Sequence, residues 1–157
     1  MGVYFDYFRA ADDDVARATH ELVGGPLGDD PSGPFDGVST KGVFADPHLE
    51  QLIARASGTP YTRGPRTSTG LWPPPDTPPP VDETSPWLTD PSVERLETRV
   101  RDALADIPAD QVHLLADGWA EDISQSVDDA ATTISALSAL CRRARESGQD
   151  LYCWSTL

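Results

Sequence analysis

The chain has 157 residues and a formal net charge of −14 at pH 7, with 26 acidic residues against 12 basic ones. A chain of this length can bury a sizeable core in one domain. The acidic excess argues against nucleic-acid binding, which needs a basic surface for the phosphates. No apolar run reaches the roughly 18 residues that would predict a membrane span.

Residues 2–9, GVYFDYFR, predict the first strand. Aromatic or aliphatic side chains fall on both of its faces, which is typical of a strand that is covered on both sides. Asp6 and Arg9 interrupt this apolar run, so it does not fit the pattern of a signal peptide. We therefore expect a cytoplasmic protein.

The next stretch predicts two helices separated by a loop. The first helix is expected over about 12–22, with acidic residues in its first turn. Residues 23–42 are rich in Gly, Pro and Asp and predict a loop. The second helix is expected to begin with Asp46 as its N-cap and Pro47 in the first turn, and to end at Gly58.

Residues 58–91 contain ten of the fifteen prolines, including LWPPPDTPPP. Proline has no backbone N–H to donate, so this stretch predicts an extended polyproline loop and no helix or central strand. Trp72 and Trp87 are expected to pin the loop to the domain. Exposed tryptophans would instead indicate an interface.

The rest of the chain predicts three helices and a strand. One helix is expected to begin at Asp90-Pro91, because its apolar residues recur at helical spacing: Val93, Leu96, Val100 and Leu104. Another is expected over about 110–121, with Trp119 on its inner face. The last is expected from Ser126, in a capping box with Asp129, to Gly148.

The terminal LYCWSTL predicts a strand that pairs with the N-terminal strand. The predicted fold class is therefore α+β. We expect one domain over 1–157, in which a small sheet is covered by four or five helices and the long Pro-rich loop spans 58–91.

Four blocks, in this order, carry a resemblance: MGVYFDYFRA, GGPLG at 24–28, FDGVSTKGV at 35–43 and RRARESGQDLYCW at 142–154. They resemble a set of short, uncharacterised actinobacterial proteins. That resemblance implies a compact cytoplasmic protein and supplies no activity. The layout of an N-terminal strand with a C-terminal helix and strand is also similar to the YfbM-like family, which lies near the immunity-type proteins of bacterial toxin systems.

No motif predicts a catalytic residue, a cofactor or a metal site. The three histidines are far apart in sequence and none lies in an HxxxH or HExxH pattern. Cys141 and Cys153 are expected to be buried thiols, although a bridge between them is an alternative. Lys41, the only lysine, lies in STKG, which lacks the upstream glycine of a phosphate-binding loop and predicts a turn.

The charge pattern gives the functional hypothesis. Eight acidic residues and no Lys or Arg occur from Asp102 to Asp129, which favours a basic protein partner. The alternative is a solvated acidic face that only keeps the protein soluble. We expect a non-enzymatic binding protein, such as an antagonist of the immunity type or a regulatory partner. The predicted partner-binding residues are Asp117, Trp119, Glu121 and Asp122.

Two alternatives make different structural predictions. A small enzyme or a small-molecule-binding protein would use the 23–43 loop and the Pro-rich loop as walls of a pocket. That pocket would hold His48 or Lys41 beside a carboxylate with a perturbed pKa. A subunit of a larger assembly would expose an apolar patch. The sequence leaves the oligomeric state open.

Overall fold

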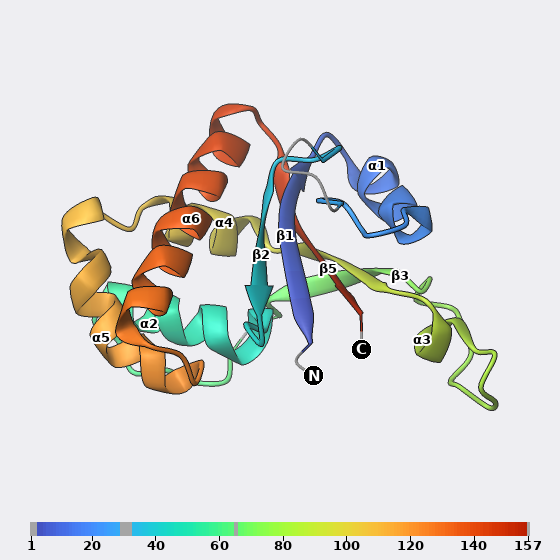
Figure 1. Ribbon diagram of the computed structural model, residues 1–157, viewed down its shortest axis with the longest axis horizontal. Coiled ribbons are helices and arrows are strands. Elements are labelled where there is room, and N and C mark those ends of the chain that lie inside the picture. Colours follow the sequence, from blue (N-terminus) through green and yellow to red (C-terminus); the bar gives the residue numbers. More distant parts are fainter. Residues whose placement is uncertain (1–2, 29–32, 65, 157) are drawn as a thin grey trace.

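The computed structural model describes residues 3–28, 33–64 and 66–156. The predicted strand start at Gly2, part of the predicted 23–42 loop and the ends of the predicted 1–157 domain lie outside these residues. Over these three ranges, five strands form one antiparallel sheet in the order β2-β1-β5-β4-β3 (Figure 1). The strands are β1 (Tyr4–Ala10), β2 (Gly37–Lys41), β3 (Ser68–Trp72), β4 (Ser92–Leu96) and β5 (Asp150–Thr156).

In the described residues six α-helices accompany the sheet, with three short helical turns of other types. The α-helices are α1 (Asp13–Arg17), α2 (Glu50–Ser57), α3 (Pro86–Thr89), α4 (Thr98–Ala105), α5 (Val112–Asp122) and α6 (Val127–Glu146). The turns are η1 (Ala18–Glu21), η2 (Ala45–Leu49) and η3 (Ala109–Gln111). No helix in the described ranges is both long enough and apolar enough to cross a membrane.

The two terminal strands pair in the middle of the sheet, as predicted. Tyr7 of β1 lies opposite Cys153 of β5, and β5 pairs with β4 on its other side. Helices and strands occur in the arrangement expected of the α+β class, so the predicted fold class is confirmed.

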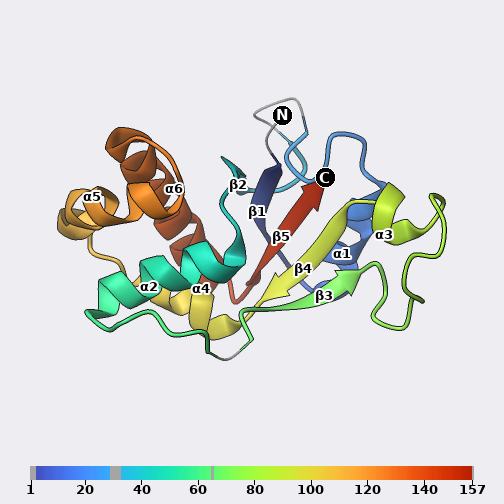
Figure 2. The same ribbon diagram turned by 90° about the horizontal axis from the view of Figure 1, so that it is seen from below.

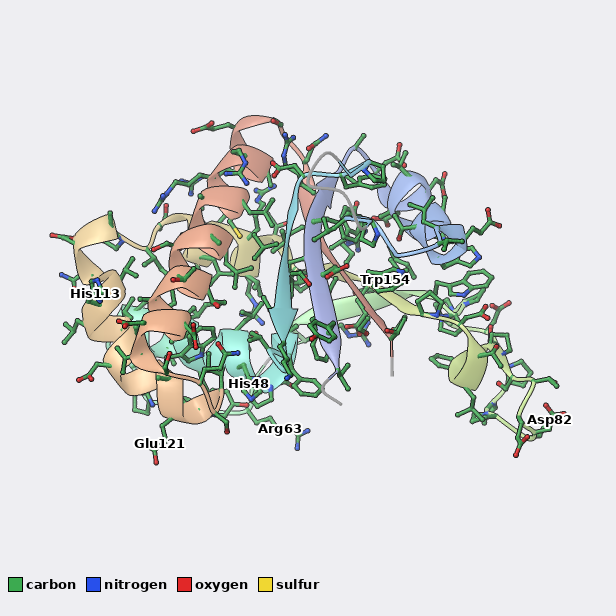
Figure 3. All side chains as sticks on the ribbon, viewed as in Figure 1. His48, Arg63, Asp82, His113, Glu121 and Trp154 are labelled. Atoms are coloured by element: carbon green, nitrogen blue, oxygen red, sulfur yellow. The ribbon has the colours of Figure 1, made fainter. Side chains whose placement is uncertain are left out.

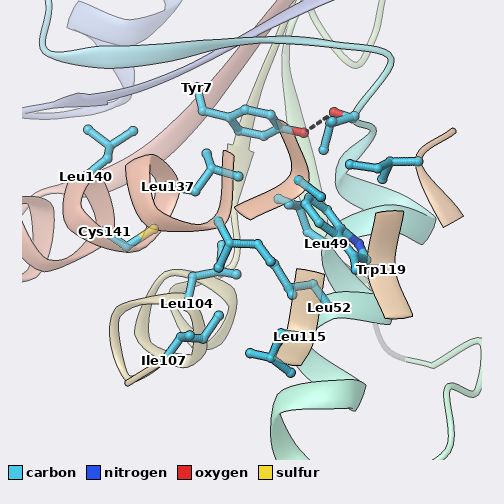
Figure 4. Close-up of a cluster of buried hydrophobic side chains, with 14 of the residues drawn as sticks. Tyr7, Leu49, Leu52, Leu104, Ile107, Leu115, Trp119, Leu137, Leu140 and Cys141 are labelled. Carbon is cyan, nitrogen blue, oxygen red and sulfur yellow. Dashed lines mark hydrogen bonds between the residues drawn. The ribbon is translucent and has the colours of Figure 1, made fainter. Parts of the chain in front are cut away.

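The sheet is covered on both faces, as the two-sided apolar pattern of β1 predicted. Helices α2, α4, α5 and α6 lie on one side and α1 on the other (Figure 2). The helical side holds the larger core, which includes Tyr7, Trp119 and Leu137, all fully buried (Figure 4). On the opposite side a smaller cluster contains Phe8, Val93 and Tyr152.

Local signals at the helix ends were confirmed at several positions. The hydroxyl of Ser126 accepts a hydrogen bond from the backbone N–H of Asp129 at 3.1 Å, which caps α6. Gly58 comes directly after the last residue of α2, and Gly148 comes after Ser147, the C-cap of α6. Both glycines have positive φ angles, a conformation that glycine adopts without strain.

The predicted helix beginning at Asp90-Pro91 is wrong in its first half. Residues Ser92–Leu96 form β4, and helix α4 begins only at Thr98. Val93 is buried in the small cluster and Leu96 in the large core. A strand covered on both faces can therefore place apolar residues three apart, which imitates the spacing of a helix.

Three other predictions need correction. The 23–42 loop contains β2, and the 58–91 loop contains β3 and α3. Asp46 has the extended backbone typical of an N-cap (φ −117°, ψ 120°), but within the described ranges no backbone N–H of the following turns donates to its carboxylate, and α2 begins only at Glu50. Its carboxylate instead accepts a hydrogen bond from the hydroxyl of Tyr61 at 3.3 Å.

Residues 73–91, between β3 and β4, form a projection that we call the arm. It contains α3 and extends away from the sheet at the end of the molecule opposite α5 (Figure 1). No residue from 74 to 91 is buried. At its base the indole of Trp72 stacks on His20 at 3.7 Å and donates a hydrogen bond to Asp90 at 3.1 Å.

Candidate functional site: an acidic helix face

Helix α5 is amphipathic and presents a charged face to solvent. Its buried residues are Val112, Leu115, Ala116, Trp119 and Ala120. Its outward residues follow the spacing of one helical stripe, starting in η3: Asp110, Leu114, Asp117 and Glu121, all exposed. Figure 3 shows Glu121 and His113 on this side of the molecule, at the end opposite the arm.

We define the acidic face as Asp110, Asp117, Glu121 and Asp128, with Leu114 among them. Asp128 belongs to the first turn of α6 and borders the same groove as His113 of α5. Within the described ranges, none of these four carboxylates forms an ion pair or a side-chain hydrogen bond. Leu114 is 70% exposed, so the face combines free negative charge with an apolar side chain.

The other acidic residues of the predicted 102–129 stretch are already occupied. Asp102 pairs with Arg101 at 2.8 Å, and Asp106 pairs with Arg145 at 2.7 Å. Asp122 pairs with Arg55, and Asp129 accepts a hydrogen bond from the hydroxyl of Ser126 at 2.8 Å. Four of the eight acidic residues in this stretch therefore have side-chain partners, and the four of the acidic face have none within the described ranges.

Two of the predicted partner-binding residues have structural roles. Trp119 is fully buried, and its indole N–H donates a hydrogen bond to the backbone oxygen of His48 at 2.8 Å. It cannot be the exposed anchor that we considered. The carboxylate of Asp122 pairs with Arg55 at 2.9 Å. Asp117 and Glu121 are exposed as required, and Leu114, which the sequence reasoning missed, is the exposed apolar residue of this helix.

Two acidic residues lie at the end of α5 where the helix dipole disfavours negative charge. A helix C-terminus carries partial negative charge and favours Lys or Arg, yet Glu121 and Asp122 occupy the last turn of α5. Asp117 and Glu121 are also like charges four residues apart, which costs about 0.2–0.5 kcal/mol. Helix α6 follows the opposite rule, with acids in its first turn and arginines in its last. The unfavourable placement on α5 therefore points to function.

Grooves flank α5 on both sides. The groove between α2 and α5 has a volume of about 610 Å³ and includes Arg55, Leu114 and Gly118 in its lining. A Cβ atom at Gly118 would lie 2.6 Å from Nη1 of Arg55, so glycine lets Arg55 cross the helix to reach Asp122. The groove between α5 and α6, about 720 Å³, is bordered by His113 and Asp128.

The enzyme alternative predicted a pocket between the 23–43 loop and the Pro-rich loop, and the cavity beside Lys41 has only the first of these walls, through residues 39–42. Lys41 lines a cavity of about 720 Å³, together with Gln125 and Asp129. Its walls are the end of β2, the α5–α6 turn and the start of α6, so the Pro-rich loop takes no part. His48 does not line it, and its Nδ1 accepts a hydrogen bond from the backbone N–H of Phe44 at 3.1 Å.

The titratable groups whose pKa is raised by burial lie in the sheet and the core, and Ser39, which hydrogen-bonds Asp6, also lines the cavity beside Lys41. Burial raises the pKa of Asp6 in β1 and of Glu94 in β4, and a hydrogen bond from a serine, Ser39 or Ser68 respectively, partly offsets each shift. Burial also raises the pKa of Cys141 to about 12 and that of Cys153 well above its usual value.

Both cysteines are free thiols in the core, so they form no bridge. Since the thiolate is the reactive form, these raised pKa values make both thiols poor nucleophiles. Among the residues that the structure describes, no three His, Cys, Asp or Glu side chains are arranged to hold a metal ion.

Comparison with known proteins adds no relative. No protein-family model, no curated protein and no solved structure matches the chain. Any functional interpretation therefore depends on the residues described above. The charge, the exposure and the helix electrostatics of the acidic face all favour a binding surface there.

Proposed function

We propose that this is a non-enzymatic binding protein that docks the acidic face on a basic protein, as an antagonist of the immunity type or a regulatory partner. The observation that carries the proposal is the placement of Asp117 and Glu121, which are exposed and, in the described part of the chain, without partners, with Glu121 in the negatively charged last turn of α5. A cationic partner would offset the unfavourable electrostatic energy of these carboxylates with favourable charge interactions.

The neighbouring residues support a specific mode of docking. Leu114 lies in the same stripe as Asp117 and Glu121 and provides an apolar contact at the centre of the charged surface. Charged residues around an apolar centre accelerate association and select the partner, and the apolar contact slows dissociation. The partner should therefore present Arg or Lys around a small apolar depression.

Charge reversal on α5 tests the proposal. The variant Asp117→Lys/Glu121→Lys changes the net charge by +4, from −14 to −10, because each substitution adds two positive charges. The matched control Glu21→Lys/Glu146→Lys makes the same change at exposed positions outside the acidic face. Affinity capture from the native host is performed with both variants and the original chain, at about 0.05 M and about 0.5 M salt.

We expect the original chain and the control to retain a basic protein at low salt and to lose it at high salt. The α5 variant should fail to retain it even at low salt. Surface plasmon resonance with the purified partner should then show a lower association rate for the α5 variant. The proposal is wrong if the α5 variant and the original chain capture the same partner equally.

A further inference from the structure

The arm is ordered without a core of its own. The indole N–H of Trp87 donates hydrogen bonds to the backbone oxygens of Pro78 at 3.0 Å and Thr77 at 3.4 Å. The hydroxyl of Thr84 donates to Asp82 at 2.6 Å and closes the turn before α3. Eight of the nineteen residues of 73–91 are proline, which restricts the backbone and lowers the entropy lost on ordering.

The arm exposes large apolar side chains at a projecting position. Val81 is 89% exposed, Leu88 is 57% exposed and Trp87 is 40% exposed. The indole hydrogen bonds fix the ring of Trp87 and leave two fifths of the residue exposed to solvent. A rigid, partly exposed tryptophan beside an exposed leucine resembles the anchors of protein interfaces, which bind with little loss of conformational freedom.

The charge of the arm selects the kind of partner. No Lys or Arg occurs from residue 67 to residue 94. Within the described part of the arm, Asp76, Asp82 and Glu83 form no ion pair and are exposed. These carboxylates belong to the same projecting segment as the exposed apolar residues, and Asp82 and Glu83 directly follow Val81, so the complementary surface combines apolar and basic groups.

We propose that the arm is a separate interaction element, which places Trp87 and Leu88 on an amphipathic basic segment of a partner protein. It does not depend on the acidic face of α5, because the two surfaces lie at opposite ends of the molecule: Figure 3 shows Asp82 of the arm far from Glu121. With both surfaces in use, the protein would bridge two basic molecules.

Nuclear magnetic resonance of the full-length, ¹⁵N-labelled chain tests this with defined probes. The probes are three synthetic peptides of about 15 residues, long enough for a helical turn pattern. One repeats Lys and Leu in an amphipathic helical pattern, one has Glu in place of each Lys, and one has Ser in place of each Leu. The indole N–H signals of the four tryptophans report where each peptide binds.

The Lys/Leu peptide should shift the Trp87 indole and the Leu88 amide, and leave the buried Trp119 unchanged. We expect the Glu/Leu and Lys/Ser peptides to bind at least about tenfold more weakly. Leu88→Ser should also weaken binding of the Lys/Leu peptide about tenfold, while the Trp87 hydrogen bonds hold the arm in place. Val23→Ser, at an exposed apolar position outside both the arm and the acidic face, is the matched control and should leave arm binding unchanged.

Three results would overturn the proposal. Shifts confined to α5 would show that the acidic face alone binds basic peptides. Equal binding of the Glu/Leu peptide would remove the charge argument. Arm signals that change on dilution of the protein without peptide would assign the arm to a second copy of this chain. Failure of the α5 charge-reversal experiment would leave the outcome for the arm unaffected.

Discussion

Helix α5 and the arm both belong to stretches without basic residues, yet they are held in place by opposite means. Helix α5 buries one side in the large core and leaves acids on the other. The arm buries nothing from 74 to 91 and depends on prolines and a few hydrogen bonds. The two tryptophans show the difference, because Trp119 is buried in the core and Trp87 is partly exposed to solvent.

The first prediction concerns Trp119. Replacing it with alanine removes a fully buried ring and its hydrogen bond to His48, so the free energy of unfolding should fall by about 3–5 kcal/mol. Urea denaturation followed by circular dichroism measures this. A loss below about 1 kcal/mol would contradict the assignment of Trp119 to the core.

An electrostatic contact of intermediate strength links the helical layer to the sheet. Asp36, just before β2, accepts hydrogen bonds from Arg143 of α6 and Arg9 of β1, each at 2.7 Å. The hydrogen bond from Arg143, followed by that from Arg9, lowers the pKa of Asp36. Because these groups are partly exposed, Asp36→Asn should cost about 1 kcal/mol or less at neutral pH.

The effect of Asp36→Asn on stability should depend on pH. The folded pKa of Asp36 is below the unfolded value of about 3.9, so its contribution is complete above that pH and is lost as the pH falls through the folded value. The stability difference between the original chain and Asp36→Asn should therefore shrink at about pH 3. Asp14→Asn, at a highly exposed pair with Arg17, is the control and should change little at either pH.

The smallest effect is expected on the arm. Trp87→Ala removes a ring that lies outside both hydrophobic clusters, so the free energy of unfolding should change by no more than about 0.5 kcal/mol. The same urea measurement used for Trp119 allows direct comparison. A loss similar to that of Trp119→Ala would show that the arm contributes to global stability, and the contrast between the two regions would fail.

The sequence predicted those parts of the fold whose signals are local and strong. The aromatic terminal strands and the capped α6 were confirmed, because their residues favour one structure regardless of context. The edge strands β2 and β3 were missed, since each has five residues and contains a glycine. Their pairing with β1 and β4 is set by the tertiary structure and not by local preference.

The candidate site was predictable only in part, for a similar reason. Charge counting located the acidic stretch, but it could not tell which acids would be neutralised, because Arg55 and Arg145 come from distant positions in the chain. Helical spacing placed Trp119 with Val112 and Leu115, which predicted its burial better than its use as an anchor. The same spacing puts Leu114 on the outer stripe and could have identified it.

The position of β5 has a consequence for how the chain folds during synthesis. Strands β1 and β2 form one pair and β3 and β4 another, and only β5, made after all of them, joins the two pairs. Until residues 150–156 leave the ribosome, β1 and β4 each keep an unpaired edge, which is a hazard for aggregation. The two strand pairs can therefore join into one sheet only after residues 150–156 are translated, and a chain that stops before Asp150 would present two separate strand pairs to the cell's quality-control proteases.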